Sequence, residues 1–249
     1  MLYALSCQRG NLTMKRQIKQ RLAKIIYLAG GLGIGILVFL IYNGYIWPNS
    51  YFAYKYQVQG IDVSAYQGMI NWETVAQNKR LHFVFIKASE GMDYQDSYFR
   101  KNWDESNNRG ILRGAYHYFR TTSSGLAQAR NFESIVPAEQ GSLPPVVDVE
   151  EDGLKEEELK TFLDELESHY KQKPIIYVVY PLYDKYIKNE FTDYPIWIRD
   201  VIKTPRLSDG REWSFWQYCN RGRIKGIDTF VDINIYAKDY EELRKLTFH

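Results

Sequence analysis

Two acidic side chains lie two residues apart in the stretch 143–152, whose sequence is LPPVVDVEED. A double proline precedes a short apolar run there, and the run ends in Asp148 and Glu150. Residues two apart on a strand share a face, with Cα atoms about 6.5 Å apart, so both carboxyl groups would point the same way. Burying such a pair is costly unless one member is neutral or both are hydrogen-bonded. A catalytic pair and a strand that runs out into an acidic loop explain the stretch equally well.

Further acidic residues stand at or near the ends of other predicted strands. Asp62 lies near the end of the first strand, Glu90 follows the second and Asp232 lies on the last. The C-terminal ends of strands in a parallel barrel meet at one mouth, so these carboxyl groups would converge with Asp148 and Glu150. Their repulsion is expected to raise some of their pKa values. A carboxyl group that stays neutral near pH 7 is what general acid catalysis requires.

Each of these acids also has a structural explanation. Asp62 could cap the turn after its strand, although its GIDVS context favours a site residue. Asp232 could pair with Arg199 or Lys225, which would be its default role if it stood alone. Glu90 is expected to be structural, through a loop cap or an ion pair with Lys87.

Aromatic residues also stand at strand ends, namely Tyr118, Tyr177, Trp197, Trp216 and Tyr218. Acid groups surrounded by aromatic rings fit a glycosidase cleft better than a phosphate site, which would need glycine-rich loops and basic residues. The sequence has no P-loop, HExxH or GxSxG element. Each ring taken alone is more often a core residue. His117 is expected to be a hydrogen-bonded strand residue, because four scattered histidines give no ligand spacing. We expect no metal and no cofactor.

The part of the chain after residue 57 alternates strands and helices. The predicted strands cover 58–64, 82–88, 113–119, 143–152, 174–179, 194–199, 212–218 and 230–235, and the predicted helices cover 72–78, 97–108, 123–135, 156–170 and 239–246. Continuous apolar strands alternating with helices predict a parallel sheet covered by helices, an α/β fold. The last three strands leave little room for helices between them. Eight strands therefore predict a closed, irregular TIM-like barrel that has lost its last helices.

The first 57 residues differ in composition from the rest. Residues 1–24 are polar and basic, residues 25–47 carry no charge, and residues 48–57 form a linker to a catalytic domain at 58–249. The uncharged run is long enough, at about 1.5 Å per residue, to cross a hydrocarbon core of about 30 Å. The basic residues before it and the aromatic residues at its far end predict a cytoplasmic N-terminus and a domain outside the cytoplasm. We favour a single uncleaved transmembrane anchor over a signal peptide, because the run is long and no small-x-small cleavage site follows promptly.

The overall composition fits one globular domain with an appendage. The chain has 249 residues, a formal net charge of +2, 25% charged residues and 45% hydrophobic residues, which disfavours disorder and a nucleic-acid partner. Aromatic residues make up 16% of the chain, which suits stacking on sugar rings or a membrane interface, although an aromatic-rich core would give the same number. The two cysteines, Cys7 and Cys219, flank the apolar run, so we expect no disulfide framework.

Six motifs follow one another in chain order on the predicted strands. They are GIDVSAYQG (60–68), FIKASEG (85–91), GAYHYFR (114–120), VVDVE (146–150), WQY (216–218) and VDIN (231–234). The same motifs occur in this order in glycoside hydrolase family 25 lysozymes, and the chain resembles that family from about Gly60 to Tyr236. The resemblance implies an incomplete (β/α)8 barrel, described as (β/α)5β3. It also implies a muramidase that cleaves the β-1,4 bond between N-acetylmuramic acid and N-acetylglucosamine in peptidoglycan.

The same resemblance implies a role for each matching residue. Glu150 resembles the general acid that protonates the leaving oxygen. Asp148 resembles the carboxylate that orients the 2-acetamido group of the substrate, whose carbonyl oxygen would attack the anomeric carbon. Asp62 and Asp232 match two further acidic positions of the site. The expected substrate contacts are Lys87, Tyr118, Tyr177, Trp197, Trp216 and Tyr66.

Three questions stay open at this point. The family is described as retaining, and attack by the substrate's own acetamido group is favoured here, because a retaining carboxylate pair must flank the bond at about 5.5 Å whereas Asp148 and Glu150 share one strand. Arg199 in WIRD stands where relatives tend to have a small residue, so the preference of that subsite is unsettled. A degenerate barrel that binds wall glycan without cutting it is the competing hypothesis, and the intact acidic set argues against it. We expect the catalytic domain to be monomeric.

Overall fold

The computed structural model describes residues 2–248, without the side chains of residues 2–13 and 15. The chain divides after Ile46 into two compact units, which are described separately. The side chain of Cys7 lies outside the described residues, and Cys219 is buried with a free thiol.

The first unit is one helix, α1 (Leu2–Tyr42). It begins well before the apolar run, because the Lys and Arg residues of the basic stretch are themselves good helix formers. It ends five residues before Trp47, where Gly44 adopts a positive φ of 69° and its N–H bonds the carbonyl of Ile41. The part from Arg16 to Tyr42 is long and apolar enough to cross a membrane. A membrane anchor and a signal sequence both meet that criterion.

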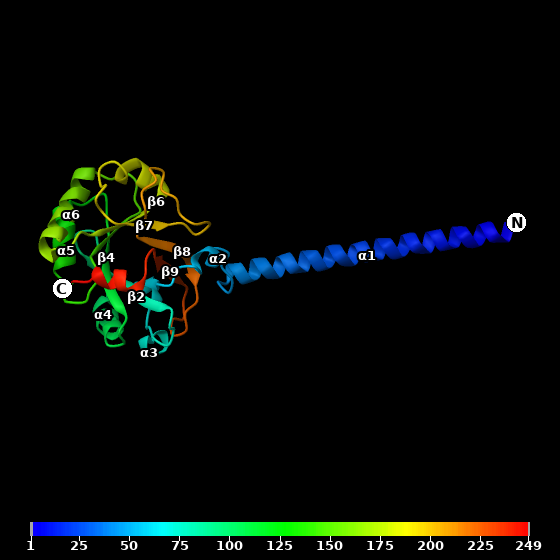
Figure 1. Cartoon of the computed structure of the whole chain (residues 1–249), viewed down its shortest axis with the longest axis horizontal. Helices are drawn as coiled ribbons and strands as arrows, with labels where there is room; N and C mark the ends of the chain where they lie inside the picture. Colours follow the sequence, from blue (N-terminus) through cyan, green and yellow to red (C-terminus); the bar gives the residue numbers. More distant parts are fainter. Residues whose placement is uncertain (1, 249) are drawn as a thin grey trace. The chain divides into compact units, whose positions relative to one another are not determined.

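The second unit is built around a closed barrel (Figure 1). Its strands are β1 (Gln59–Val63), β2 (Leu81–Glu90), β4 (Leu112–Tyr118), β5 (Val146–Val149), β6 (Ile175–Val179), β7 (Ile196–Arg199), β8 (Phe215–Gly222) and β9 (Val231–Tyr236). They follow one another around the barrel in the order β1-β9-β8-β7-β6-β5-β4-β2, and β1 closes the ring by pairing with β2. A two-residue strand, β3 (Tyr94–Gln95), extends β2 as a short antiparallel ladder outside the ring.

Helical segments follow each of the first five barrel strands. They are η1 (Ala65–Gln67) and α3 (Trp72–Val75) after β1, α4 (Phe99–Asn107) after β2, α5 (Gly125–Glu133) after β4, α6 (Glu156–Tyr170) after β5, and α7 (Tyr180–Leu182) with the π turn η2 (Tyr183–Ile187) after β6. Residues 200–214 and 223–230, which connect the last three strands, contain no helix. The predicted barrel with its last helices missing is therefore confirmed, although α3 is shorter than expected.

The direction of the last strand differs from the prediction of a parallel barrel. β9 runs antiparallel to both β8 and β1, because the eight residues between β8 and β9 form a hairpin and cannot make a crossover. Asp232 therefore lies at the beginning of its strand. In an antiparallel strand this is the end that meets the C-terminal ends of the other strands, so Asp232 still reaches the expected rim.

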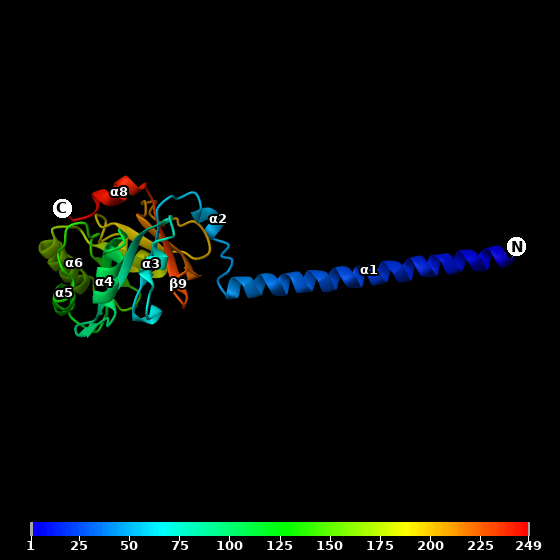
Figure 2. The same cartoon turned by 90° about the horizontal axis from the view of Figure 1, so that it is seen from below.

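An apolar layer fills the inside of the barrel below that rim. Its buried members are Val58, Phe83, Phe85, Leu143, Val146, Ile175, Tyr177, Trp197, Phe215, Tyr236 and Leu243. Two glycines make room for the rings: a Cβ at Gly60 would lie 2.3 Å from Phe83, and a Cβ at Gly114 would lie 2.5 Å from Phe85. Helix α8 (Tyr240–Lys245) contributes Leu243 and so closes this end of the barrel, across from α3 (Figure 2).

Residues 47–57, most of which were expected to form a linker, pack on the barrel. They include the short helix α2 (Ser50–Ala53). The Trp47 indole N–H donates to the carbonyl of Tyr218 at 2.7 Å, and the buried Asn49 side-chain amide donates to the carbonyl of Asp200 at 2.8 Å. This segment is thus part of the folded unit.

Candidate active site

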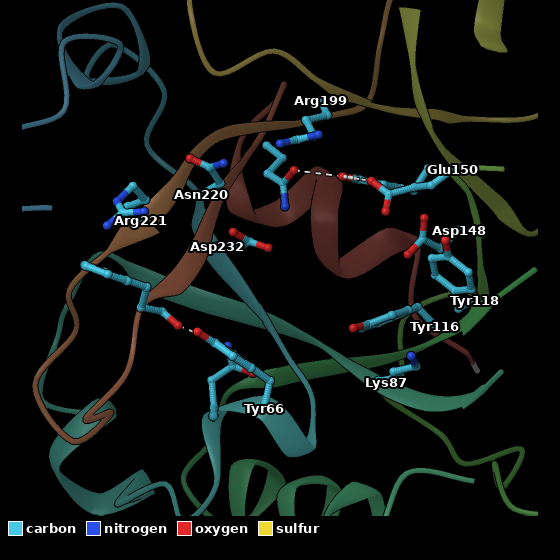
Figure 3. A pocket seen from close by; sticks show the side chains of 14 residues that line it. Tyr66, Lys87, Tyr116, Tyr118, Asp148, Glu150, Arg199, Asn220, Arg221 and Asp232 are labelled. Carbon is cyan, nitrogen blue, oxygen red and sulfur yellow. Dashed lines mark hydrogen bonds between the residues drawn. The ribbon is translucent and has the colours of Figure 1, made fainter. Parts of the chain in front are cut away.

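A cavity of about 470 Å³ opens at the rim where the strands end (Figure 3). It is lined by Tyr66, Gln67, Lys87, Tyr116, Tyr118, Asp148, Glu150, Tyr177, Arg199, Gln217, Asn220, Arg221, Phe230 and Asp232. Most of these residues come from the C-terminal ends of β2, β4, β5, β6, β7 and β8, and Asp232 comes from the start of β9. Strand alternation places them one layer above the apolar interior, because side chains two apart share a face.

Asp148 and Glu150 both line the cavity, but their surroundings differ. Asp148 is half-buried, and its Oδ1 is a buried atom with no hydrogen-bond partner in the described part of the chain. Burial and the neighbouring Glu150 raise the pKa of Asp148 well above its usual value, with Asp62 adding to this and Lys87 opposing it. Glu150 is exposed to solvent at the cavity mouth, and its Oε1 lies 3.3 Å from the Tyr177 hydroxyl.

A second acid pair lies across the β1–β9 ladder, where Asp62 and Asp232 are direct partners. Burial, the Asp232 charge and, more weakly, Glu150 raise the pKa of Asp62 well above its usual value, against hydrogen bonds from Asn234 and Gln217. Burial likewise raises the pKa of Asp232 to about 6, although the nearby Arg199 opposes this rise. Asp232 lines the cavity. Asp62 does not line it, but a hydrogen bond joins it to Gln217, which does.

A chain of hydrogen bonds joins the two acid pairs. Asn234 Nδ2 donates to Asp62 Oδ2 at 2.7 Å, and Gln217 Nε2 donates to the same oxygen at 3.4 Å. The other end of the Gln217 amide, Oε1, accepts from the Tyr177 hydroxyl at 2.8 Å. The Tyr177 hydroxyl also points at Glu150 Oε1, at the longer distance of 3.3 Å. Tyr177 is thus shared between Gln217 and Glu150 and connects the two acid pairs.

Lys87 stands at the other side of the cavity with an ionic partner of its own. Its ammonium lies 2.6 Å from Glu90 Oε2 and 5.2 Å from the centre of the Tyr118 ring. Glu90 also lies 3.5 Å from Arg120 Nη1. The prediction that Glu90 is structural and pairs with Lys87 is confirmed. Lys87 and Tyr118 both line the cavity, as expected for substrate contacts.

Trp197 and Trp216, both expected as substrate contacts, are buried away from the cavity. Trp197 lies in the apolar layer one step below Arg199, and its indole N–H donates to Asn234 Oδ1 at 3.0 Å. Trp216 points to the outer side of β8, where its N–H donates to the carbonyl of Asp200 at 2.7 Å. The structure thus places both rings in the core. Residue type predicts a substrate contact for them, but the strand face and the depth of each position decide where the ring lies.

The same alternation identifies site residues that residue type alone did not suggest. Tyr116 shares a face with Tyr118, Gln217 shares a face with Phe215 inside the barrel, and Asn234 shares a face with Asp232. In the motifs GAYHYFR, WQY and VDIN, counting by twos from a known inward residue would have found all three. Burial and the nearby acids raise the pKa of Tyr116 well above its usual value, so its hydroxyl is a neutral donor facing the carboxyl groups.

His117 has the structural role that was predicted for it. Gln128 donates through Nε2 to two backbone carbonyls, so its Oε1 accepts from His117 Nε2 at 3.0 Å. His117 Nδ1 then accepts from the Ser89 hydroxyl at 2.8 Å. Burial lowers the pKa of His117 to about 4, which keeps the ring neutral. Among the side chains that the structure describes, no group of three or more His, Cys, Asp or Glu residues is placed to hold a metal ion.

Comparison with known proteins connects this geometry to a family. Glycosyl hydrolases family 25 matches residues 61–227. Lysozyme M1 of Streptomyces globisporus is 34% identical over 71% of this chain and 67% of its own length. The chain belongs to glycosyl hydrolase family 25. The protein YegX of Escherichia coli K12 is 41% identical over 76% of this chain and 73% of its own length. A solved family 25 glycosyl hydrolase from Bacillus anthracis covers 78% of this chain and 94% of its own, with 39% identity and a TM-score of 0.73.

As a family 25 member the chain is a glycosidase, and its cavity holds the groups that glycoside hydrolysis needs. A glycosidase requires a carboxylic acid that protonates the leaving oxygen and a negative environment for the positive charge that develops at the anomeric carbon. Glu150 is the carboxyl group of the cavity that faces solvent, and Asp148, Asp62 and Asp232 lie on its inner side. The family 25 barrel therefore brings one accessible acid next to three enclosed ones.

The enclosed acids predict that the family 25 domain is more stable at mildly acidic pH. A carboxyl group whose folded pKa is raised stabilises the fold fully below its unfolded pKa, near 4, and loses that contribution as pH rises through its folded pKa, here about 6 for Asp232. When the pH is lowered from 7 to 5, Asp232 alone should raise the free energy of unfolding by about 1 kcal/mol. Asp232→Asn should reduce this gain, measured by urea unfolding at both pH values. Identical pH dependence in the two proteins would contradict the prediction.

The burial of Trp216 predicts an effect on stability and not on turnover. Trp216→Phe removes the indole N–H bond and part of the packing, and should lower the free energy of unfolding by about 1–3 kcal/mol. Its kcat/KM at a temperature where it is folded should stay within about twofold of wild type. Tyr66, which lines the cavity and is 71% exposed, is the contrast: Tyr66→Ala should raise KM and leave stability unchanged. A raised KM for Trp216→Phe would show that the ring does reach substrate.

Proposed function

We propose that this family 25 glycosidase is a muramidase that cleaves the β-1,4 bond between N-acetylmuramic acid and N-acetylglucosamine in peptidoglycan. The similarity to a protein named as a lysozyme supports the substrate class. The observation that carries the proposal is the pair at the end of β5, Glu150 open at the cavity mouth and Asp148 half-buried with a free acceptor atom.

Glu150 serves as the general acid in this proposal. Its position at the mouth gives it access to the leaving oxygen of a bound glycan. The Tyr177 hydroxyl, which is held by Gln217 Oε1, lies 3.3 Å from Glu150 Oε1 and helps to fix the position of that carboxyl group. Protonated Glu150 is the form that donates a proton to the glycosidic oxygen.

Asp148 orients the 2-acetamido group of the substrate in this proposal. Its Oδ1 is enclosed and unpaired, so it is available to accept the acetamido N–H and turn the acetamido oxygen toward the anomeric carbon. Asp62 and Asp232 place carboxyl oxygens on the side of the cavity where the anomeric carbon becomes positive. Lys87, Tyr118, Tyr177 and Tyr66 bind the sugar, since all four line the cavity.

The products of digestion test this function directly. Purified protein is incubated with peptidoglycan, and the soluble fragments are reduced and analysed by mass spectrometry. A muramidase leaves N-acetylmuramic acid at the new reducing ends, which is the result we expect. Reducing N-acetylglucosamine ends would show that the other bond is cut, and no released fragments would show a barrel that only binds glycan.

We also propose that α1 anchors the enzyme in a membrane with the N-terminus in the cytoplasm and the catalytic domain outside it. The described part of α1 has the length and apolar composition of a span, and the basic residues Arg16, Lys19, Arg21 and Lys24 precede its apolar part. The protein should stay in the membrane pellet after extraction with alkaline carbonate, with its N-terminal residues intact by mass spectrometry. A mature chain that begins after the helix would identify α1 as a signal sequence.

A further inference from the structure

The cavity has a basic side that the proposed chemistry does not use. Arg199, the last residue of β7, lines the cavity on the side across from Lys87 (Figure 3). Arg221 of β8 lines it next to Asn220, and its guanidinium lies 4.3 Å from the centre of the Phe230 ring, which holds it by a cation–π contact. Unlike Lys87, which pairs with Glu90, Arg199 has no hydrogen bond or ion pair within residues 2–248.

The state of Arg199 indicates a ligand. The side chain is half-buried, and a guanidinium carries five N–H donors in a planar fork. Its charge acts on Asp232 and Tyr177 only from beyond ion-pair distance, where it opposes the rise that burial causes in the pKa of each. A cation held in a cavity without a partner favours the binding of an anionic group there. A planar carboxylate fits the fork in a two-point contact.

We propose that Arg199, with Arg221 beside it, forms a subsite for a carboxylate carried by the glycan substrate. The inference rests on the proposed muramidase function. Two carboxylates of peptidoglycan have this chemistry, the free lactyl group of a muramic acid that has lost its peptide and the acidic groups of an attached peptide. The four acids in and around the cavity disfavour a ligand of higher negative charge, because each additional charge would be repelled.

A simpler explanation is that Arg199 only balances the charge of Asp232. In that case, loss of Arg199 would raise the pKa of Asp232 and change the pH profile by the same amount for every substrate. A carboxylate subsite would instead change KM only for substrates that carry the carboxylate. The two explanations therefore differ in how the change in KM varies from one substrate to another, which does not depend on overall activity.

The test compares matched substrates on the full-length protein in detergent. One substrate is glycan freed of peptide, the second is the same glycan with its lactyl carboxyl groups converted to methylamides, and the third is peptide-bearing peptidoglycan. For Arg199→Gln we expect KM to rise about 10- to 100-fold on at least one carboxylate-bearing substrate with kcat little changed, and no change on the methylamide glycan. Arg199→Lys should recover part of the affinity, because it keeps the charge and loses the fork.

Each arm has a defined meaning. A KM effect confined to the peptide-free glycan identifies the lactyl carboxylate, and an effect confined to the peptide-bearing substrate identifies a peptide carboxylate. Equal KM changes on all three substrates, or none, would overturn the subsite. Arg206→Gln, an exposed arginine outside the cavity, should behave as wild type. If the wild-type protein releases no fragments with reducing N-acetylmuramic acid, the proposed muramidase function is wrong. If the protein cleaves all three substrates and Arg199→Gln changes their KM values equally or not at all, only the subsite is wrong.

Discussion

Glu150→Gln is expected to lower kcat/KM on peptidoglycan by about 10²- to 10⁴-fold, the usual contribution of a general acid. The amide keeps the size of the side chain and its place at the cavity mouth, but it cannot give a proton to the leaving oxygen. The fold should be unaffected, because Glu150 is exposed and its contact in the structure is a 3.3 Å approach to Tyr177. Release of reducing ends measures the activity, and the melting temperature checks the fold.

The matched control for Glu150 lies two residues further along the same acidic run. Asp152 is exposed and bonds Lys185, Tyr186 and the backbone N–H of Gly153, away from the cavity. Asp152→Asn should keep wild-type turnover, with at most a small loss of stability from a surface ion pair. Turnover of Glu150→Gln similar to that of Asp152→Asn would remove Glu150 from the role of acid.

Asp148→Asn is expected to lower kcat by about 10²- to 10³-fold with a smaller change in KM. The enclosed Oδ1 has no partner before substrate binds, and a carboxylate there would hold the acetamido N–H more strongly as positive charge develops on the cyclising group. An asparagine has the same shape without the charge. The variant should therefore also lose affinity for a thiazoline mimic of the cyclised sugar, measured by calorimetry.

The competing role for Asp148 is that of a nucleophile. That role predicts a covalent glycosyl–enzyme, which a slow fluorinated substrate would trap and mass spectrometry would locate on Asp148. Detection of such an adduct would overturn substrate assistance. Substrate assistance predicts no such adduct, because the acetamido oxygen of the substrate itself bonds the anomeric carbon. The resulting oxazoline-type intermediate is then opened by water.

The alternation of strands and helices was enough to predict most of the barrel. Continuous apolar strands separated by helices led to the first five β/α units and to the loss of helices after β7. The antiparallel direction of β9 was not predicted, because the parallel pattern of the first strands was extended to the last one, although eight residues between β8 and β9 are too few for a parallel crossover. The acids were nevertheless placed at the right rim, since Asp232 lies at the start of β9.

The aromatic and amide residues of the site were harder to predict. The sequence predicts a substrate contact for Trp216, an aromatic residue at a strand end, and none for Gln217, yet the strand turns Gln217 inward and Trp216 outward. Whether a side chain points into the barrel or out of it depends on the residue at which the strand begins. Sequence propensity locates that residue only to within a few positions. The free Oδ1 of Asp148 and the direction of the hydrogen bonds through Gln217 depend on three-dimensional contacts among β1, β5, β6 and β8, and no local pattern encodes them.

The packing of residues 47–57 on the barrel has a further consequence for where the enzyme works. Since Trp47 is already bound to the domain, only residues 43–46 connect α1 to it. Fully extended, this connection spans about 18 Å. For a membrane-anchored enzyme, such a short connection would keep the catalytic domain close to the bilayer and limit it to the glycan strands there. The enzyme would then trim the innermost layer of the wall, and a longer inserted spacer would extend its range without altering a single residue of the cavity.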